Sequence, residues 1–188
     1  MKEFQKMTDP IKIQRIARWT LHCISNIACY RAGWNETPHP KTLRNNDDFW
    51  ARANGNFLDA AVLNWCILFA EADGKHYWLK AFETKVHLAN DLYQAMGMTE
   101  SAFNDELLEV KRYRDKYLAH LDNPPSRELF YPETEFMLKS TKHLLETLKS
   151  NEQTKAALIG VYLNADGHYN EKYEEAKTEI LASIRSPS

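Results

Sequence analysis

The residues best suited to chemistry lie in one short stretch, KRYRDKYLAHLDNPP at 111–125, which contains Arg114 and His120. On a helical projection, Arg114 falls in the middle of an apolar side formed by Phe103, Leu107, Val110, Leu118 and Leu121. A guanidinium stays charged in a protein, so burying it without a partner is costly. Arg114 must therefore pair with an acidic residue, extend toward solvent, or line a cleft or interface where an anion binds.

His120 does not share this side of an ideal helix. Six residues place it about 120° around the axis from Arg114 and roughly 9 Å along it. Two arrangements would bring the two side chains together. The helix ends before His120, which the following Pro124–Pro125 pair favours, or a two-fold dimer brings the same patch of two chains together.

The segment RDKYLAH at 114–120 resembles the signature of the HEPN superfamily. That signature is an arginine followed by Asn, Asp or His, with a histidine several residues later, and Asp115 fits its second position. The continuation AHLDN is similar to the branch related to abortive-infection (phage-defence) proteins. The resemblance implies a four-helix bundle that dimerises and places its arginine and histidine in a cleft between the protomers.

Many members of this superfamily are metal-independent RNases that act as toxins or in phage defence, and others are non-catalytic and bind nucleotides or proteins. An antitoxin protein is a possible partner of a toxin. The resemblance therefore implies a catalytic pair: His120 as general acid or base on the RNA, and Arg114 as the phosphate-binding fork. Cleavage would leave a 2′,3′-cyclic phosphate. Asp115 would orient or balance the pair, and Tyr117 would supply a stacking face or a hydroxyl.

Three further cations, Lys111, Arg112 and Lys116, make the stretch locally basic and suit an RNA backbone. A solvated helix face is the simpler interpretation of such mixed charge. Nothing in the sequence has the spacing of a metal site, a nucleophile elbow or a glycine-rich phosphate loop. We therefore expect no metal and no cofactor.

Two alternatives stay open. Arg114 would be purely structural if it paired with Glu106, Glu109 or an acid on another helix, and His120 would then stabilise a helix C-terminus. The chain would alternatively be a non-catalytic module that binds a nucleotide or a protein partner through the same cleft. A net charge of −2 and the lack of a separate basic surface in the sequence favour this second alternative.

The composition is that of an ordinary globular protein, with 44% hydrophobic and 27% charged residues in 188. The three cysteines form no CxxC pair, and Cys23 and Cys66 fall within apolar helical patterns, which predicts buried thiols. The first residues have no signal-peptide core, and the longest apolar run, 60–70, is too short to span a bilayer. These features predict a cytoplasmic protein without a membrane segment.

The apolar spacing predicts an all-α, up-and-down bundle in a single domain over 1–188, with a core over about 8–150 and a C-terminal helical extension over about 153–184. A capping residue before Pro10 starts the first helix, Gly97 ends the third and Thr99 starts the fourth. An Asp-Gly pair is expected to make a turn within NADG at 164–167. The expected helices span about 10–33, 48–72, 76–96, 100–123 and 132–150, with one or two shorter helices over 153–184.

Overall fold

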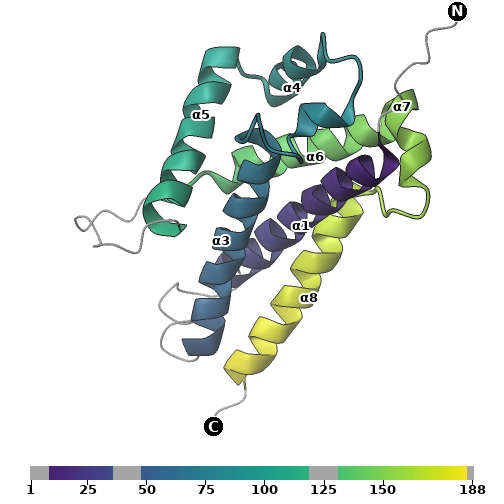
Figure 1. Ribbon diagram of the computed structural model, residues 1–188. Coiled ribbons are helices and arrows are strands. Elements are labelled where there is room, and N and C mark those ends of the chain that lie inside the picture. Colours follow the sequence, from purple (N-terminus) through teal and green to yellow (C-terminus); the bar gives the residue numbers. More distant parts are fainter. Residues whose placement is uncertain (1–8, 36–47, 119–130, 186–188) are drawn as a thin grey trace, which may run out of the picture.

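The computed structural model describes residues 9–35, 48–118 and 131–185. In these residues the protein is an assembly of helices without strands, so the predicted all-α bundle is confirmed (Figure 1). The long helices are α1 (Pro10–Asn35), α3 (Asp48–Phe69), α5 (Glu100–Tyr113), α6 (Thr134–Ser150) and α8 (Ala165–Arg185). Shorter helical segments are η1 (Trp78–Ala81), α4 (Leu88–Met96), η2 (Arg114–Leu118), α7 (Glu152–Lys155) and η3 (Ala156–Leu158).

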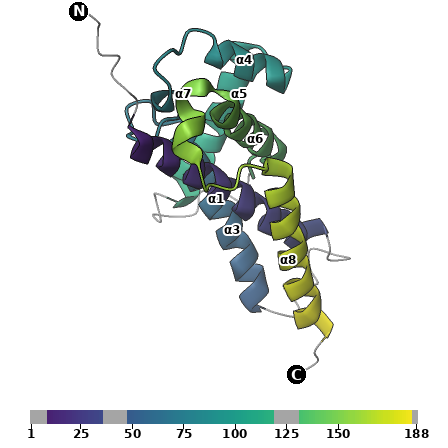
Figure 2. The same cartoon turned by 90° about the vertical axis from the view of Figure 1, so that its right-hand side faces the viewer.

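Helix α1 is the central element of the bundle. It packs against α3 on one side and α8 on another, and α6 crosses it (Figures 1 and 2). The predicted start is confirmed, because the Asp9 carboxylate accepts a hydrogen bond from the Ile11 amide at 2.9 Å. The helix continues to Asn35, two residues beyond the expected end.

The core is built from aromatic side chains of several helices. The fully buried Trp65 of α3 stacks on Phe69 at 5.0 Å between ring centroids and lies 5.4 Å from Phe136 of α6. Its indole Nε1 donates to the Ser140 hydroxyl at 2.8 Å, so the buried N–H is satisfied. Phe103 of α5 contacts Phe136 at 5.0 Å, which joins α5 to the same core. Cys23 and Cys66 are buried free thiols, as predicted.

The prediction of a helix over 76–96 is wrong for the first half of that range. The chain forms the short η1 turn, becomes extended at Phe82, and is helical again only in α4. Trp78 and Phe82 are buried by this route, and the Glu83 amide donates to the Gln153 side chain at 3.3 Å. Tertiary packing therefore overrides the local helical preference here. The predicted left-handed cap at Gly97 is confirmed, with φ of 67°.

The tail also differs from expectation. The Asp-Gly pair does not make a turn, because both residues lie in the first turn of α8. The Asn164 side-chain oxygen accepts from the Gly167 amide at 2.9 Å and so caps the helix. Helix α8 then lies along α1 (Figure 1). The Ser25 hydroxyl of α1 and Nε2 of His168 on α8 are 2.7 Å apart. No described helix combines the length and the apolar character that crossing a membrane requires.

Candidate functional site

Arg114 lies at a change of helix geometry. Helix α5 starts with the Thr99 hydroxyl accepting from the Ala102 amide at 3.2 Å, as predicted, but its α-helical part ends at Tyr113. Residues Arg114–Leu118 form a π-helical turn instead of the expected continuation of the α-helix. Such single π turns are rare and occur frequently at functional sites. The departure from ideal helix geometry therefore begins at the first residue of the RDKYLAH segment.

Two carboxylates from different elements hold the Arg114 guanidinium. Its Nη1 donates to Oε1 of Glu71, in the turn that follows α3, and its Nε and Nη2 each lie 2.8 Å from Oδ1 of Asp115. The arginine side chain is only 20% exposed, whereas the two acids are about half exposed. Burial disfavours the charge, but the hydrogen bonds to Asp115 and Glu71 outweigh it and raise the pKa of Arg114.

These contacts identify the acidic partners of Arg114. Arg114 pairs with an acid just beyond another helix, and not with Glu106 or Glu109. Glu109 instead lies 3.5 Å from Arg112, one turn away on α5. Phe103 and Val110 are buried on the apolar side of α5, and Leu107 and Leu118 are half-buried. Arg114 is therefore a compensated arginine at the edge of an apolar helix face.

Tyrosine rings lie next to this ion pair. The buried Tyr113 donates its hydroxyl to Oδ1 of Asp59 on α3 at 2.9 Å. Its ring is 5.2 Å from the ring of Tyr117 and 6.3 Å from that of Tyr131, which is 44% exposed. Burial first, and then the hydrogen bond to Asp59, raise the pKa of Tyr113, so its hydroxyl stays protonated. The predicted supporting residue Tyr117 thus belongs to an aromatic cluster beside Arg114.

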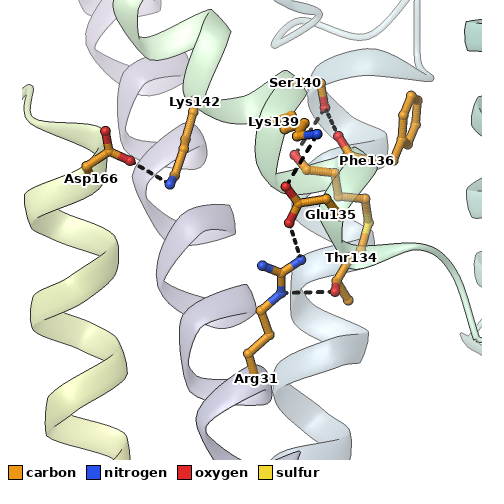
Figure 3. Close-up of polar contacts among 9 residues, drawn as sticks. Arg31, Thr134, Glu135, Phe136, Lys139, Ser140, Lys142 and Asp166 are labelled. Carbon is orange, nitrogen blue, oxygen red and sulfur yellow. Dashed lines mark hydrogen bonds and ion pairs between the residues drawn. The ribbon is translucent and has the colours of Figure 1, made fainter. Parts of the chain in front are cut away.

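Helix α1 holds the start of α6 close to this cluster. The Arg31 Nε donates to the Thr134 hydroxyl at 3.1 Å, and its Nη2 lies 2.8 Å from Oε2 of Glu135 (Figure 3). The hydrogen bond from Arg31 lowers the pKa of Glu135. Thr134 and Glu135 form the first turn of α6, so this contact holds the start of α6 against α1, and Tyr131 precedes that start by three residues.

The other basic residues of the stretch lie on the outside of the helix. Arg112 and Lys116 are exposed and Lys111 is half-buried, so all three remain compatible with a strand of RNA passing over this face. Cys66 lies near Arg114, but burial raises the pKa of its thiol to about 12 despite the neighbouring guanidinium. Cys66 is therefore a thiol at neutral pH and not a nucleophile.

His120, the second predicted catalytic residue, lies outside the described residues, as does Leu121. Within the part of the chain that the structure describes, no group of three or more His, Cys, Asp or Glu side chains is arranged to hold a metal ion. The prediction missed Glu71, Asp59 and Tyr131. Glu71 is 43 residues from Arg114 in the chain, and no local pattern connects them.

The arrangement presents a guanidinium with two exchangeable acidic partners beside tyrosine rings. Such a group binds an oxyanion when a phosphate replaces one of the carboxylates. No protein-family model matches this sequence, and neither a curated protein nor a solved structure is significantly similar to it.

Proposed function

We propose that this protein is a metal-independent endoribonuclease of the HEPN type, with Arg114 and His120 as its catalytic residues. The observation that carries the proposal is the π-helical turn that begins at Arg114. This turn moves the RDKYL segment out of α-helical register, which supports the first of the two arrangements that would bring the arginine and the histidine together.

The proposed reaction is a transesterification within the RNA. His120 or its counterpart in a second copy removes the proton of a ribose 2′-hydroxyl, and the 2′-oxygen attacks the adjacent phosphorus. The bond from phosphorus to the 5′-oxygen breaks, and that oxygen takes up a proton. Arg114 stabilises the charge that develops on the phosphate oxygens. The products are a 2′,3′-cyclic phosphate and a free 5′-hydroxyl.

The surroundings of Arg114 suit this role. A phosphate can replace the half-exposed Glu71 at the guanidinium, while Asp115 keeps the side chain in place. Tyr117 and Tyr131, whose rings lie 5.2 and 6.3 Å from that of Tyr113, are candidates for stacking on a base of the bound RNA. The proposal includes a cytoplasmic homodimer, with an antitoxin protein as a possible partner of a toxin-like enzyme.

A second candidate is a non-catalytic module that binds a nucleotide or a protein partner. The observation that favours it is that Glu71 and Asp115 already satisfy the guanidinium. In that case Arg114 stabilises the junction of α3 and α5, and any anion bound there is held without being cut.

The deciding experiment incubates end-labelled single-stranded RNA with the purified protein in EDTA. We expect the wild type to produce cyclic-phosphate ends, and we expect His120→Ala and Arg114→Ala to lose the activity. Lys149→Ala is the control, because Lys149 is an exposed cation at the far end of α6. Cleavage by both variants at the wild-type rate would remove these residues from the mechanism. The absence of cleavage in the wild type across varied RNAs would favour the binding module.

A further inference from the structure

Helix α1 has a charge pattern unlike the rest of the chain. Its 26 residues include no acid, whereas Lys12, Arg15, Arg18 and Arg31 are cations. Only Arg31 of these is engaged with the start of α6. By contrast, α8 beside it contains five acids and three cations within 21 residues. Helix α1 therefore carries four positive charges and no negative charge, although the net charge of the chain is −2.

Three of the four cations of α1, Lys12, Arg15 and Arg18, lie within two turns of each other near its start. Arg15, Arg18 and His22 follow one another at three- and four-residue spacing, and all three side chains are exposed. Lys12 lies one turn before them and is half-buried. In the described parts of the chain, no ion pair joins Lys12, Arg15 or Arg18 to an acidic side chain. Their charge is thus available to a ligand.

The turn after α3 extends this surface. Lys75 is exposed there, and His76 packs its ring against Trp19 of α1 at 6.3 Å between centroids. Trp19 also contacts His22, at 6.0 Å. The Lys80 ammonium donates to the carbonyl oxygens of Asp73 and Gly74, at 2.8 and 3.0 Å, and so holds the turn in place. A tryptophan thus lies between two imidazoles from separate elements.

The charged residues that lower the pKa of His76 are all cations. Burial lowers the pKa of His76, and Arg15, Lys75 and Lys12 lower it further. No acidic group contributes to this shift, although Asp73 lies in the same turn. We call the set Lys12, Arg15, Arg18, Trp19, His22, Lys75 and His76 the α1 basic face.

We propose that the α1 basic face binds the phosphate backbone of single-stranded RNA, with its imidazole and indole rings as stacking surfaces for bases. The choice of RNA as the ligand rests on the proposed function. The chemistry supports it, because proteins that bind single strands combine cations that follow the backbone with aromatic rings that stack on bases. The α1 basic face was not identified from the sequence alone.

Other polyanions fit less well. A helix that binds an anionic membrane buries its apolar side in the lipid, but the apolar side of α1 is already buried in the protein core, where Ile16, Ile24 and Ile27 are inaccessible. An acidic peptide would pair with the cations but would leave the rings around Trp19 without a planar partner. RNA uses both features of the surface.

A short segment of chain connects the α1 basic face to the acid that holds Arg114. Glu71, which holds Arg114, precedes Lys75 by four residues, so their Cα atoms are at most roughly 14 Å apart. A single strand bound on the α1 basic face can therefore continue toward the turn where Arg114 and Glu71 meet. We expect the face to hold the substrate on one side of the scissile phosphate.

The test measures binding separately from cleavage. His120→Ala protein is titrated into a fluorescein-labelled 20-nucleotide RNA of mixed sequence, and anisotropy is recorded at several salt concentrations. The triple variant Arg15→Gln, Arg18→Gln, Lys75→Gln is compared in the same background. Loss of three phosphate contacts should reduce the slope of log affinity against log salt by about 2 and weaken binding on the order of 100-fold at 0.1 M salt.

A matched control removes the same charge elsewhere. Lys139→Gln, Lys149→Gln, Lys155→Gln changes three exposed lysines on α6 and α7 that pair with nearby glutamates, and it should bind RNA like the parent. Thermal unfolding of both triple variants verifies that they fold. Equal affinity and equal salt slope for the two triples would overturn the inference, as would a parent protein that binds no RNA at low salt.

The outcomes also separate this inference from the proposed function. Binding through the α1 basic face by a wild type that cuts no RNA would keep the inference and reject the ribonuclease. If the wild type cleaves RNA and the α1 triple variant binds and cleaves RNA equally well, the ribonuclease is kept and the inference about the α1 basic face is rejected. If the α1 triple instead lost binding only to vesicles with anionic lipid or to a poly-glutamate peptide, the face would belong to that ligand and the RNA assignment would be wrong.

Discussion

Two groups of cations in this protein differ in what surrounds them. Arg114 is largely buried and is neutralised by Glu71 and Asp115. Arg15 and Arg18 on α1 are exposed and form no ion pair with an acid among the described residues, and the charges that lower the pKa of His76 are those of Arg15, Lys75 and Lys12. A compensated arginine is held in one geometry, which suits the positioning of a reacting group. An uncompensated face attracts polyanions at longer range, which suits capture.

The largest expected effect is a lower rate of RNA cleavage when the compensated arginine, Arg114, is replaced. Arg114→Ala should lower kcat for RNA cleavage by about 100- to 1,000-fold, because one preorganised donor to the developing oxyanion is lost. Arg114→Lys should recover only a small part, since an ammonium lacks the planar fork. Single-turnover cleavage at saturating RNA measures this. The free energy of unfolding should change by less than about 1 kcal/mol, because both acids are half exposed.

The α1 basic face should instead control KM. In the otherwise wild-type protein, Arg15→Gln, Arg18→Gln, Lys75→Gln should raise KM for RNA on the order of 100-fold at 0.1 M salt and leave kcat within about twofold. Initial rates over a range of RNA concentrations give both constants. A fall in kcat with an unchanged KM would show that the α1 basic face acts in the chemical step and not in substrate binding.

A pH effect should appear on the α1 basic face. Burial and the neighbouring cations lower the pKa of His76 below its ordinary value of 6.5, so the ring is neutral at pH 7. RNA affinity of the His120→Ala protein should be constant above neutrality and increase as the pH falls below 6.5, by about fivefold for one added contact at 0.1 M salt. Anisotropy titrations with His76→Gln should show a smaller increase. An equal increase in both proteins would exclude His76.

The smallest effect concerns the acid that competes with phosphate at Arg114. Glu71→Gln removes one carboxylate while Asp115 still orients the guanidinium. Inorganic phosphate should then inhibit RNA cleavage with an inhibition constant about threefold lower, the scale of one exposed ion pair. The matching change on α5, Glu109→Gln, removes an acid that pairs with Arg112 instead and should leave the constant unchanged. Equal constants for wild type and Glu71→Gln would mean that phosphate does not replace Glu71.

Local signals in the sequence predicted the elements that depend on neighbouring residues. Asp9 before Pro10, Gly97 and Thr99 each form the cap that their residue type favours. The helix over 76–96 failed because Trp78 and Phe82 gain more from burial in the core than from helical hydrogen bonds. The π turn at Arg114–Leu118 was not predicted either, since no residue in RDKYL forbids the α-helical conformation.

The sequence by itself determined the helical class, the main helix boundaries and the arginine on an apolar stripe. These follow from side-chain periodicity and capping, which act within a few residues. Only the tertiary structure decided that Glu71 and Asp115 neutralise Arg114, that Tyr131 joins Tyr113, and that Lys75 and His76 complete the α1 basic face. Apart from the adjacent Asp115, these contacts join residues far apart in the chain, so packing alone brings them together.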